Sequence, residues 1–343
     1  MKIKRMENNM KSILKYKRID DKPFLIMMCG LPGSGKSTFA ENSITVTSGA
    51  RQYKPVIHSS DGLRKEIYGN ESTQGDANKV FGELHKRIKN DLIAGKDVIY
   101  DATCIKKKQR IQFLKELKNI SCTPVCICMA TEYSLCLYNN EHRERKVPVD
   151  VIKRMQMNWQ PPHYNEGFEQ ITYIFSYLDK NYNIVNASQK DKYNLGKFFE
   201  IANSFDQENH HHKLTLGKHC ENAGQRIQRT NPDNFWLLIA TLLHDNGKLY
   251  TKTKTNSRGI EDGDCHYYQH HCVGSYNVMF YLHSFDDIKE TNIAYVTNLI
   301  YYHMHPYNAW KQSERVHNKD KLLLGEKLYN DIQLLHEADL FAH

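Results

Sequence analysis

The stretch PFLIMMCGLPGSGKSTFA, Pro23 to Ala40, decides the fold of the first part of this chain. An apolar run, Phe24 to Cys29, stops at Gly30, and GLPGSGKST then fills the pattern G-x-x-x-x-G-K-[ST]. The run predicts a buried strand, and the residues after it predict a turn into a helix. Strand, glycine loop, Lys-Ser-Thr and helix therefore come in the order that a phosphate-binding loop requires.

The residue types of this loop suit a nucleoside triphosphate. Glycines let backbone N–H groups approach the phosphates closely, while Lys36 can reach the β- and γ-phosphates and Ser37 can ligate Mg²⁺. The start of the helix near Lys36 also faces the anion. A flexible glycine turn is the alternative, and the order of the pattern argues against it. We expect ATP or GTP with Mg²⁺, bound by Gly30, Gly33, Ser34, Gly35, Lys36, Ser37 and Thr38.

Length and composition bound the rest of the chain. Its 343 residues suit two domains of roughly 150 residues each. The net charge of +8 suits a polyanionic partner, although a salt-bridged surface could also carry it. Nine cysteines without a paired C-x-x-C motif favour reduced thiols. Because there is no run of about twenty apolar residues and no signal peptide, we expect a soluble, cytoplasmic protein with no membrane partner.

Two further strands are predicted to end on carboxylates. Residues 54–61 form a short apolar strand that ends on Asp61, and residues 97–103 repeat the design with Asp101. Ligands bind at the carboxyl ends of strands in an open α/β sheet, so both acids should face the same phosphates. Arg64 follows Asp61 by one helical turn, where a surface ion pair is the alternative. The position at the strand end favours a functional site.

Basic residues follow this predicted sheet edge. A predicted helix opens with four of them, Lys106, Lys107, Lys108 and Arg110. They could form a solvated face or contact a phosphate backbone, and the sequence leaves both open. Next, residues 124–129 predict another buried strand, and this alternation of strands and helices is typical of a parallel sheet.

The polar segment 140–148 lies between two predicted helices. In a phosphotransferase such a segment can close over the site as a lid. Its arginines can then neutralise charge on the moving phosphoryl group. Arg143 and Arg145 are both candidates for this role.

Taken together, these residues resemble the polynucleotide 5′-kinase family over about residues 23–178. The resemblance rests on GLPGSGKST, on Ser59, Asp61 and Arg64, on Asp101 and Thr103, on Arg143, Val147 and Pro148, and on Glu166-Gly167-Phe168. It implies an α/β P-loop domain in which Asp61 is the general base on the 5′-hydroxyl and Arg64 holds the acceptor's 3′-phosphate. It also implies that Asp101 and Thr103 line the acceptor pocket and that Arg143 contacts the donor phosphates. The chain carries Asn139 where some members have an earlier lid arginine.

The second half of the chain has a different pattern. The residues between Tyr177 and about Leu195 predict a polar connector, and the pattern from Lys197 onward is helical almost throughout. Histidines recur there at about one per predicted helix, and imidazoles and carboxylates that converge in a helical bundle hold divalent metals. Burial of the adjacent His244 and Asp245 would otherwise cost several kcal/mol. We therefore expect a metal site.

This half resembles the HD-domain metal-dependent phosphohydrolases over about residues 197–343. The family's order H…HD…H…H…D is filled by His219, His244, Asp245, His270, His303 and Asp339. The resemblance implies an all-α bundle with one or two divalent transition metals. In it, the first metal is held by His219, His244, Asp245 and Asp339. His270 and His303 hold a second metal or contact phosphate, and Lys248 binds the scissile phosphate.

The expected organisation is an N-terminal extension (1–22), a P-loop kinase domain (23–178), a linker (179–196) and an HD domain (197–343). By resemblance, the expected function is healing of broken RNA ends: phosphorylation of 5′-hydroxyls and hydrolysis of 2′,3′-cyclic, 2′- or 3′-phosphates. The expected partners are nucleic-acid ends, RNA rather than DNA, and an RNA ligase that acts downstream. Two alternatives stay open, a small-molecule or nucleoside kinase fused to an HD nucleotidase, and an ATP-gated HD phosphohydrolase.

Overall fold

The computed structural model describes residues 14–179, 181–210 and 213–342, so the expected N-terminal extension lies largely outside the described residues. The chain folds as two compact units. The first runs to Ile152 and takes in Glu166–Ala187, and the second takes in Lys153–Asn165 and begins again at Ser188. Residues 153–165, expected in the kinase domain, therefore pack with the second unit.

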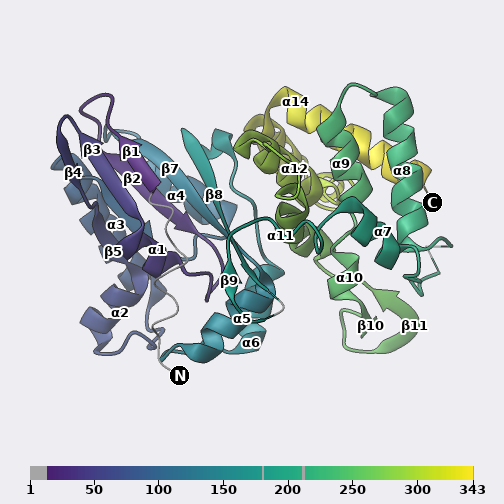
Figure 1. The fold of residues 1–343 in the computed structure, drawn as a ribbon, viewed down its shortest axis with the longest axis horizontal. Helices are drawn as coiled ribbons and strands as arrows, with labels where there is room; N and C mark the ends of the chain where they lie inside the picture. The colour runs from purple at the N-terminus through teal and green to yellow at the C-terminus, as the bar shows by residue number, and fades with distance from the viewer. Residues whose placement is uncertain (1–13, 180, 211–212, 343) are drawn as a thin grey trace. The chain divides into compact units, whose positions relative to one another are not determined.

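A six-stranded sheet forms the centre of the first unit (Figure 1). Its strands lie in the order β5 (Val56–Ser59), β6 (Val98–Asp101), β2 (Phe24–Cys29), β7 (Thr123–Thr131), β8 (Gln170–Leu178) and β9 (Ile184–Val185). Strands β5, β6, β2, β7 and β8 run parallel, and β9 pairs antiparallel with β8. The expected α/β class with a mostly parallel sheet is confirmed. Because β2 lies inside the sheet, neighbouring strands end on both sides of the glycine loop that follows it.

Helices connect these strands: α1 (Lys36–Asn42), α2 (Ser60–Tyr68), α3 (Ala77–Ile93), α4 (Lys107–Glu116), α5 (Tyr133–His142) and α6 (Val149–Gln156), with a short 3₁₀ turn at Tyr164–Glu166. Their sequences explain their ends and their packing. Helix α2 begins where the Ser59 hydroxyl accepts hydrogen bonds from two backbone N–H groups of the first turn. Helix α3 buries Val80, Leu84 and Ile88, which recur every four residues and so share one face.

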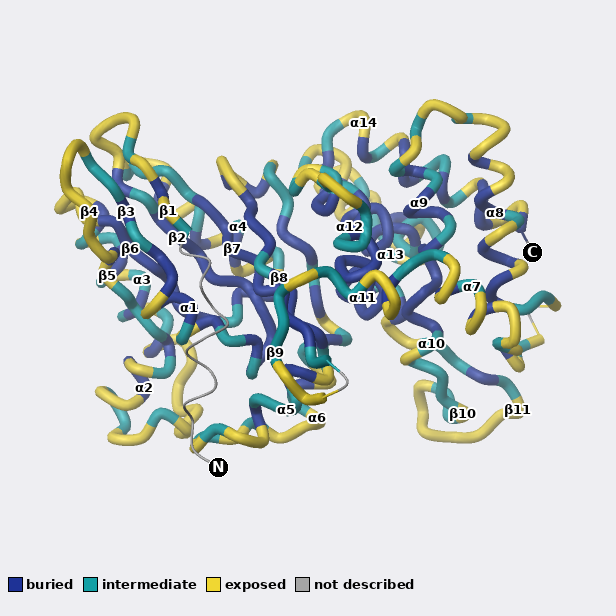
Figure 2. The backbone as a smooth tube through the Cα atoms, in the orientation of Figure 1, coloured by how far each residue is buried: buried dark blue, intermediate teal, exposed yellow. Residues whose placement is uncertain are grey.

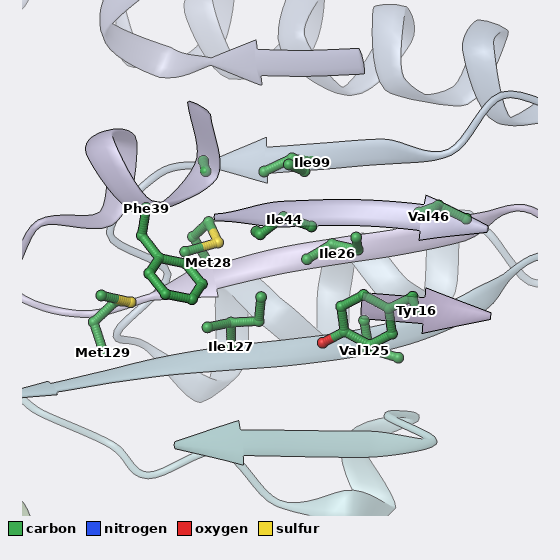
Figure 3. Close-up of a cluster of buried hydrophobic side chains, with 11 residues drawn as sticks. Tyr16, Ile26, Met28, Phe39, Ile44, Val46, Ile99, Val125, Ile127 and Met129 are labelled. Atoms are coloured by element: carbon green, nitrogen blue, oxygen red, sulfur yellow. The ribbon is translucent and has the colours of Figure 1, made fainter. Parts of the chain in front are cut away.

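A second, three-stranded sheet, which the sequence did not indicate, completes this unit: β1 (Leu14–Lys17), β3 (Ile44–Ser48) and β4 (Arg51–Tyr53). Tyr16, Ile44 and Val46 of this sheet join the buried core of the central sheet (Figure 3). Asp97 fixes the arrangement, because its carboxylate accepts hydrogen bonds from the Phe24 N–H at 2.7 Å and the Tyr53 hydroxyl at 2.6 Å. In the same core, Phe39 of α1 lies beside Met28 and Met129 (Figure 3), which anchors the helix that follows the glycine loop.

The second unit is mainly helical, as predicted. Its helices are α7 (Leu195–Ala202), α8 (Leu216–Thr230), α9 (Phe235–Leu243), α10 (Lys248–Thr251), α11 (His270–Leu282), α12 (Glu290–Tyr302), α13 (Ala309–Gln312) and α14 (Glu314–Phe341). An antiparallel hairpin, β10 (Thr253–Thr255) and β11 (Glu261–His266), interrupts them. Helices α11 and α12 are buried along most of their length (Figure 2). These two helices form the centre of the bundle, and the other helices pack around them.

Within the described part of the chain, no helix is both long enough and apolar enough to cross a membrane. All nine cysteines carry free thiols.

Candidate functional site

Residues of β7 and α5 hold the glycine loop after β2 in place. The backbone of Gly33 has φ +79°, and a Cβ there would lie 2.2 Å from the Cys136 carbonyl oxygen of α5, so this position requires glycine. Asn139 donates a hydrogen bond to the Gly33 carbonyl at 2.8 Å, and the Thr131 hydroxyl donates to the Ser34 carbonyl at 2.9 Å. These contacts fix the backbone conformation of the loop. Asn139, which replaces a lid arginine of the resembled family, has here a structural role.

Lys36 and Ser37 begin α1, directly after the loop. Lys36 is buried and donates to the Leu31 carbonyl at 2.7 Å. Burial lowers the pKa of Lys36, although the Asp101 carboxylate opposes the shift. Ser37 Oγ donates to Asp101 Oδ2 at 2.7 Å. A P-loop hydroxyl beside a strand-end carboxylate is the pair that holds Mg²⁺ in P-loop enzymes, and these two residues fit that ion.

The residues after Asp101 contact the glycine loop through their backbone. The Gly30 N–H donates to the Thr103 carbonyl at 3.0 Å. Cys104 has φ +44°, an uncommon conformation for a residue with a side chain. The Cys104 carbonyl accepts hydrogen bonds from Arg110 at 2.9 Å and from the Cys29 thiol at 3.4 Å. Asp101 and Thr103, expected in the acceptor pocket, therefore lie against the donor loop.

Asp61 lies in the first turn of α2, at the carboxyl end of β5. Its side chain is 47% exposed, whereas that of Arg64 is 10% exposed. Arg64 Nη1 donates to Asp61 Oδ1 at 3.0 Å, and Arg64 also lies over the Phe81 ring. Among the residues that the structure describes, the buried Arg64 Nε has no hydrogen-bond partner. A buried donor that is left unpaired is costly, so it favours an anionic ligand at this position.

The expected lid, residues 140–148, forms a turn that the Asn140 side chain holds together. The side-chain Oδ1 of Asn140 accepts hydrogen bonds from Arg143 at 2.8 and 3.1 Å and from the Val147 N–H at 2.9 Å. Burial, with Arg145 as the next cause, lowers the pKa of Arg143. Arg145 forms an ion pair with Asp61 instead. The structure therefore brings Arg145, and not Arg143, to the candidate base.

The basic residues at the start of α4 differ in burial. Lys106 and Lys108 are exposed. Arg110 is fully buried and forms two hydrogen bonds of 2.7 Å with the Glu166 carboxylate. Burial opposes its charge, but Glu166 outweighs that effect and raises the pKa of Arg110. Arg110 is therefore unavailable to a phosphate backbone, so the predicted contact with nucleic acid does not hold for this residue.

In the second unit, six buried side chains converge from the ends of five helices. They form two groups in which nitrogen and oxygen ligand atoms lie within 4.8 Å of one another, His219, His244 and Asp339 in one and Asp245, His270 and His303 in the other. His219 lies on α8, and His244 and Asp245 directly follow α9. His270 begins α11, His303 directly follows α12, and Asp339 lies near the end of α14.

Asp245 connects the two groups. Its Oδ2 lies 3.5 Å from His219 Nε2 and 3.4 Å from His244 Nε2, and its Oδ1 lies 3.2 Å from His270 Nε2. Burial opposes ionisation, but Lys248 and His244 hold the pKa of Asp245 well below its usual value. The carboxylate is therefore charged and presents one oxygen to each group.

The histidine side chains of each group face each other through their Nε2 atoms. The Nδ1 atoms of His244, His270 and His303 lie 2.6–2.8 Å from backbone carbonyl oxygens, which can only accept, so each Nδ1 carries a proton. Burial opposes charge on His244, but Asp245 raises the pKa of this imidazole well above its usual value, so a bound cation would displace the proton on its Nε2. In a neutral ring with the proton on Nδ1, Nε2 holds a lone pair. The Nε2 atoms of His270 and His303 lie 3.2 Å apart, as do those of His219 and His244. A cation between such atoms removes their repulsion, so the donor set fits divalent metal.

The turn after Asp245 explains how α9 reaches α11. A Cβ at Gly247 would lie 2.0 Å from the His270 carbonyl oxygen, so only glycine allows this approach. Asn246 donates to the Gly274 carbonyl at 3.1 Å. Lys248 then donates to Gln207 Oε1 at 2.9 Å and lies 2.7 Å from Asp245 Oδ2. Gln207, fully buried, orients Lys248 and was not indicated by the sequence, because a lone glutamine before a helix carries no pattern.

The family-model match falls largely in the first unit, whereas the match to a curated protein is longer than that unit. Residues 25–162, less than half of the chain, match the family model of the AAA domain. The chain is 22% identical over 257 residues to Protein KTI12 of Saccharomyces cerevisiae, a match that covers 70% of this chain and 78% of that protein. The first unit is a P-loop kinase-like domain. Nucleotide binding with Mg²⁺ follows from that class.

Two solved structures overlap with 45% of this chain at 17% identity. One is a candidate kinase from Chloroflexus aurantiacus J-10-fl, with a TM-score of 0.35 over 85% of that chain. The other is a gluconokinase from Sinorhizobium meliloti 1021, with a TM-score of 0.31 over 83% of that chain. At these scores neither structure bears on the acceptor. The function of the second unit therefore depends on its own geometry.

Proposed function

We propose that the first unit transfers the γ-phosphoryl group of ATP, or GTP, to the 5′-hydroxyl end of a polynucleotide. The observation that carries this proposal is Arg64. It is buried beside the strand-end acid Asp61, and its Nε finds no hydrogen-bond partner in the described part of the chain. A guanidinium held in this way suits a phosphate next to the reacting hydroxyl, and a nucleoside acceptor offers no such phosphate. A polynucleotide end offers one.

The roles of the other residues follow from their positions. Glycine-loop N–H groups and Lys36 hold the donor phosphates, and Ser37 with Asp101 would hold Mg²⁺, which supplies charge neutralisation on the donor. Asp61 accepts the proton of the 5′-hydroxyl as the new O–P bond forms. The bond between the β,γ-bridging oxygen and the γ-phosphorus breaks at the same time, and the nucleoside diphosphate leaves. Placing Asp101 on the Mg²⁺ side revises its expected role in the acceptor pocket.

We propose that the second unit is an HD-type phosphohydrolase that acts on 2′,3′-cyclic, 2′- or 3′-phosphate ends. The facing Nε2 atoms of the two histidine pairs, 3.2 Å apart, support this proposal. One or two divalent transition metals would be held by His219, His244, Asp339 and Asp245, with His270 and His303 on the second side. When bound, they supply polarisation of the phosphoryl oxygens. Water attacks phosphorus as the P–O bond to the ribose breaks, and one proton of that water ends on the ribose oxygen, which leaves as a hydroxyl. Lys248 holds a phosphoryl oxygen.

The two reactions would serve one purpose. Many nucleases leave RNA with a 5′-hydroxyl and a cyclic or 3′-phosphate end, and neither end can be ligated. A cyclic phosphate needs a 2′-hydroxyl, so this pairing favours RNA over DNA, with an RNA ligase as the natural downstream partner. The proposed location is the cytoplasm.

The acceptor decides between this function and the alternatives. ATP turnover should rise when a 5′-hydroxyl oligonucleotide is added and should not rise with a nucleoside or a small hydroxylated metabolite. Turnover with nucleosides alone would favour the nucleoside kinase. If ATP binding changed the phosphohydrolase rate and no acceptor were phosphorylated, the chain would be an ATP-gated hydrolase.

A further inference from the structure

Both oxygens of the candidate base are engaged in this structure. Asp61 Oδ1 accepts from Arg64 Nη1 at 3.0 Å, and Asp61 Oδ2 pairs with Arg145 Nη1. The two arginine side chains are 10% and 16% exposed, against 47% for the carboxylate. The Arg145 guanidinium on Oδ2 would compete with a substrate hydroxyl for that oxygen.

The two arginines of the lid segment differ in what holds them. Arg143 is fixed by two hydrogen bonds to the Asn140 side chain, which also closes the turn through both the N–H and the carbonyl of Val147. Arg145 lies in the same turn and pairs with Asp61, 84 positions earlier in the chain. The guanidinium of Arg145 thus reaches the place where the attacking hydroxyl must sit, whereas Arg143 is held to its own turn.

We propose that Arg145 exchanges partners during the reaction, from Asp61 in the donor-free protein to the γ-phosphoryl group once ATP is bound. This inference rests on the proposed kinase function. A γ-phosphate carries more negative charge than a carboxylate and offers paired acceptors to the guanidinium. The ion pair is partly exposed to solvent, so breaking it costs little free energy. Donor binding then frees Asp61 Oδ2 to accept the proton of the hydroxyl.

The exchange makes two binding events dependent on each other. Because the donor removes Arg145 from Asp61, the acceptor should bind better when the donor site is filled. Thermodynamic linkage requires the acceptor to improve donor binding by the same factor. Arg145 therefore has two effects of opposite sign, since it opposes acceptor binding without donor and stabilises the transferring phosphoryl group with it.

The test measures binding of a fluorescent 5′-hydroxyl oligonucleotide to the full chain, with and without a non-hydrolysable ATP analogue and Mg²⁺. In the parent chain the analogue should tighten binding by about fivefold or more. Arg145→Gln should bind the oligonucleotide tightly without the analogue and show less than about a twofold response to it. Its kcat should still fall by about 10²-fold. Lys146→Gln, an exposed neighbour on the same turn, is the matched control and should behave as the parent.

Arg145→Lys separates charge from geometry, because lysine keeps the charge but lacks paired donors. It should keep part of the coupling and lose most of the rate. Parental coupling and parental kcat in Arg145→Gln would overturn the exchange. If the parent bound no oligonucleotide at all and still turned over ATP with another acceptor, the polynucleotide proposal itself would fall, and the exchange with it.

Discussion

Ser37 and Asp101 meet through a 2.7 Å hydrogen bond from Ser37 Oγ to Asp101 Oδ2, across 64 positions of the chain. One ends the glycine loop and the other ends β6, the strand that pairs with β2. The parallel sheet brings these two ends to one edge, which is why a hydroxyl and an acid so far apart in sequence form one ion site. The first prediction follows from this pair.

Asp101→Asn should lower kinase kcat by about 10²–10³-fold, because the amide keeps the shape but removes the charge that holds Mg²⁺. Steady-state phosphoryl transfer at varied Mg²⁺ measures this effect. Asp20→Asn, which changes an exposed carboxylate of the same unit, is the control and should leave the rate unchanged. If Asp101→Asn kept the parental rate, Asp101 would not be a ligand of Mg²⁺.

Lys36→Ala and Asp61→Ala should both abolish 5′-phosphorylation, for different reasons. Loss of Lys36 removes charge from the donor phosphates, so donor binding should weaken. Asp61→Ala removes the base, which is worth about 10²–10⁴-fold in rate, and should leave donor affinity intact. Titration with a fluorescent ATP analogue separates the two variants. Transfer at the parental rate by Asp61→Ala would show that the base is another group.

Arg64→Ala should discriminate between acceptors. A hydrogen bond to a charged group contributes about 1.5–3 kcal/mol, so kcat/KM for a 3′-phosphorylated acceptor should fall by about 10–100-fold. For a bare nucleoside the loss should be much smaller, since it has no phosphate to offer. Equal losses on both acceptors would point to a small-molecule kinase.

Asp245→Asn should eliminate phosphate release from cyclic and 3′-phosphate ends, because one neutral amide cannot serve both ligand groups. Chelation of the parent should do the same until metal is restored, and kinase activity with Mg²⁺ should survive because the units have separate cores. Full end-phosphate hydrolysis by Asp245→Asn would remove the metallohydrolase proposal.

His270→Ala tests the number of ions. Elemental analysis should find bound metal lowered from about two ions per chain to about one, if the second group holds an ion of its own. His266→Ala, on the exposed hairpin β10–β11, is the matched control and should keep the parental content. One ion in the parent would assign His270 and His303 to phosphate contacts instead.

Arg110→Met should destabilise the first unit by about 3–5 kcal/mol, because it leaves the Glu166 carboxylate buried without its partner. The double variant with Glu166→Leu should recover most of that loss, since an apolar pair can replace a buried ion pair. Thermal unfolding followed by circular dichroism reports both changes. Equal stability of the single variant and the parent would contradict the buried pair.

Local patterns were enough to predict the main elements. The apolar run before Gly30 is β2, and the runs that end near Asp61 and Asp101 are β5 and β6. The helical character of the second half is also confirmed. These features depend on residues close together in sequence, where periodicity and turn residues are informative.

Contacts between distant residues could not be predicted in the same way. The sheet of β1, β3 and β4 depends on tertiary packing, since its strands are short and partly exposed. The buried position of Arg110 depends on its ion pair with Glu166, 56 residues later. The sequence around Arg110 alone therefore suggested a charge on the surface. The contact of Arg145 with Asp61 likewise follows from how the lid turn folds on Asn140. Gln207 had no motif to mark it.

The most direct test of the two proposed activities uses one RNA oligonucleotide with a 5′-hydroxyl and a 2′,3′-cyclic phosphate. Incubation with the full chain, ATP, Mg²⁺ and a divalent transition metal is followed by mass spectrometry of the RNA. The account predicts gain of one phosphoryl group at the 5′ end and opening or loss of the terminal phosphate at the other. Lys36→Ala should prevent the first change alone, and Asp245→Asn the second alone. An unmodified RNA, while ATP is consumed or free nucleotides are hydrolysed, would contradict the account.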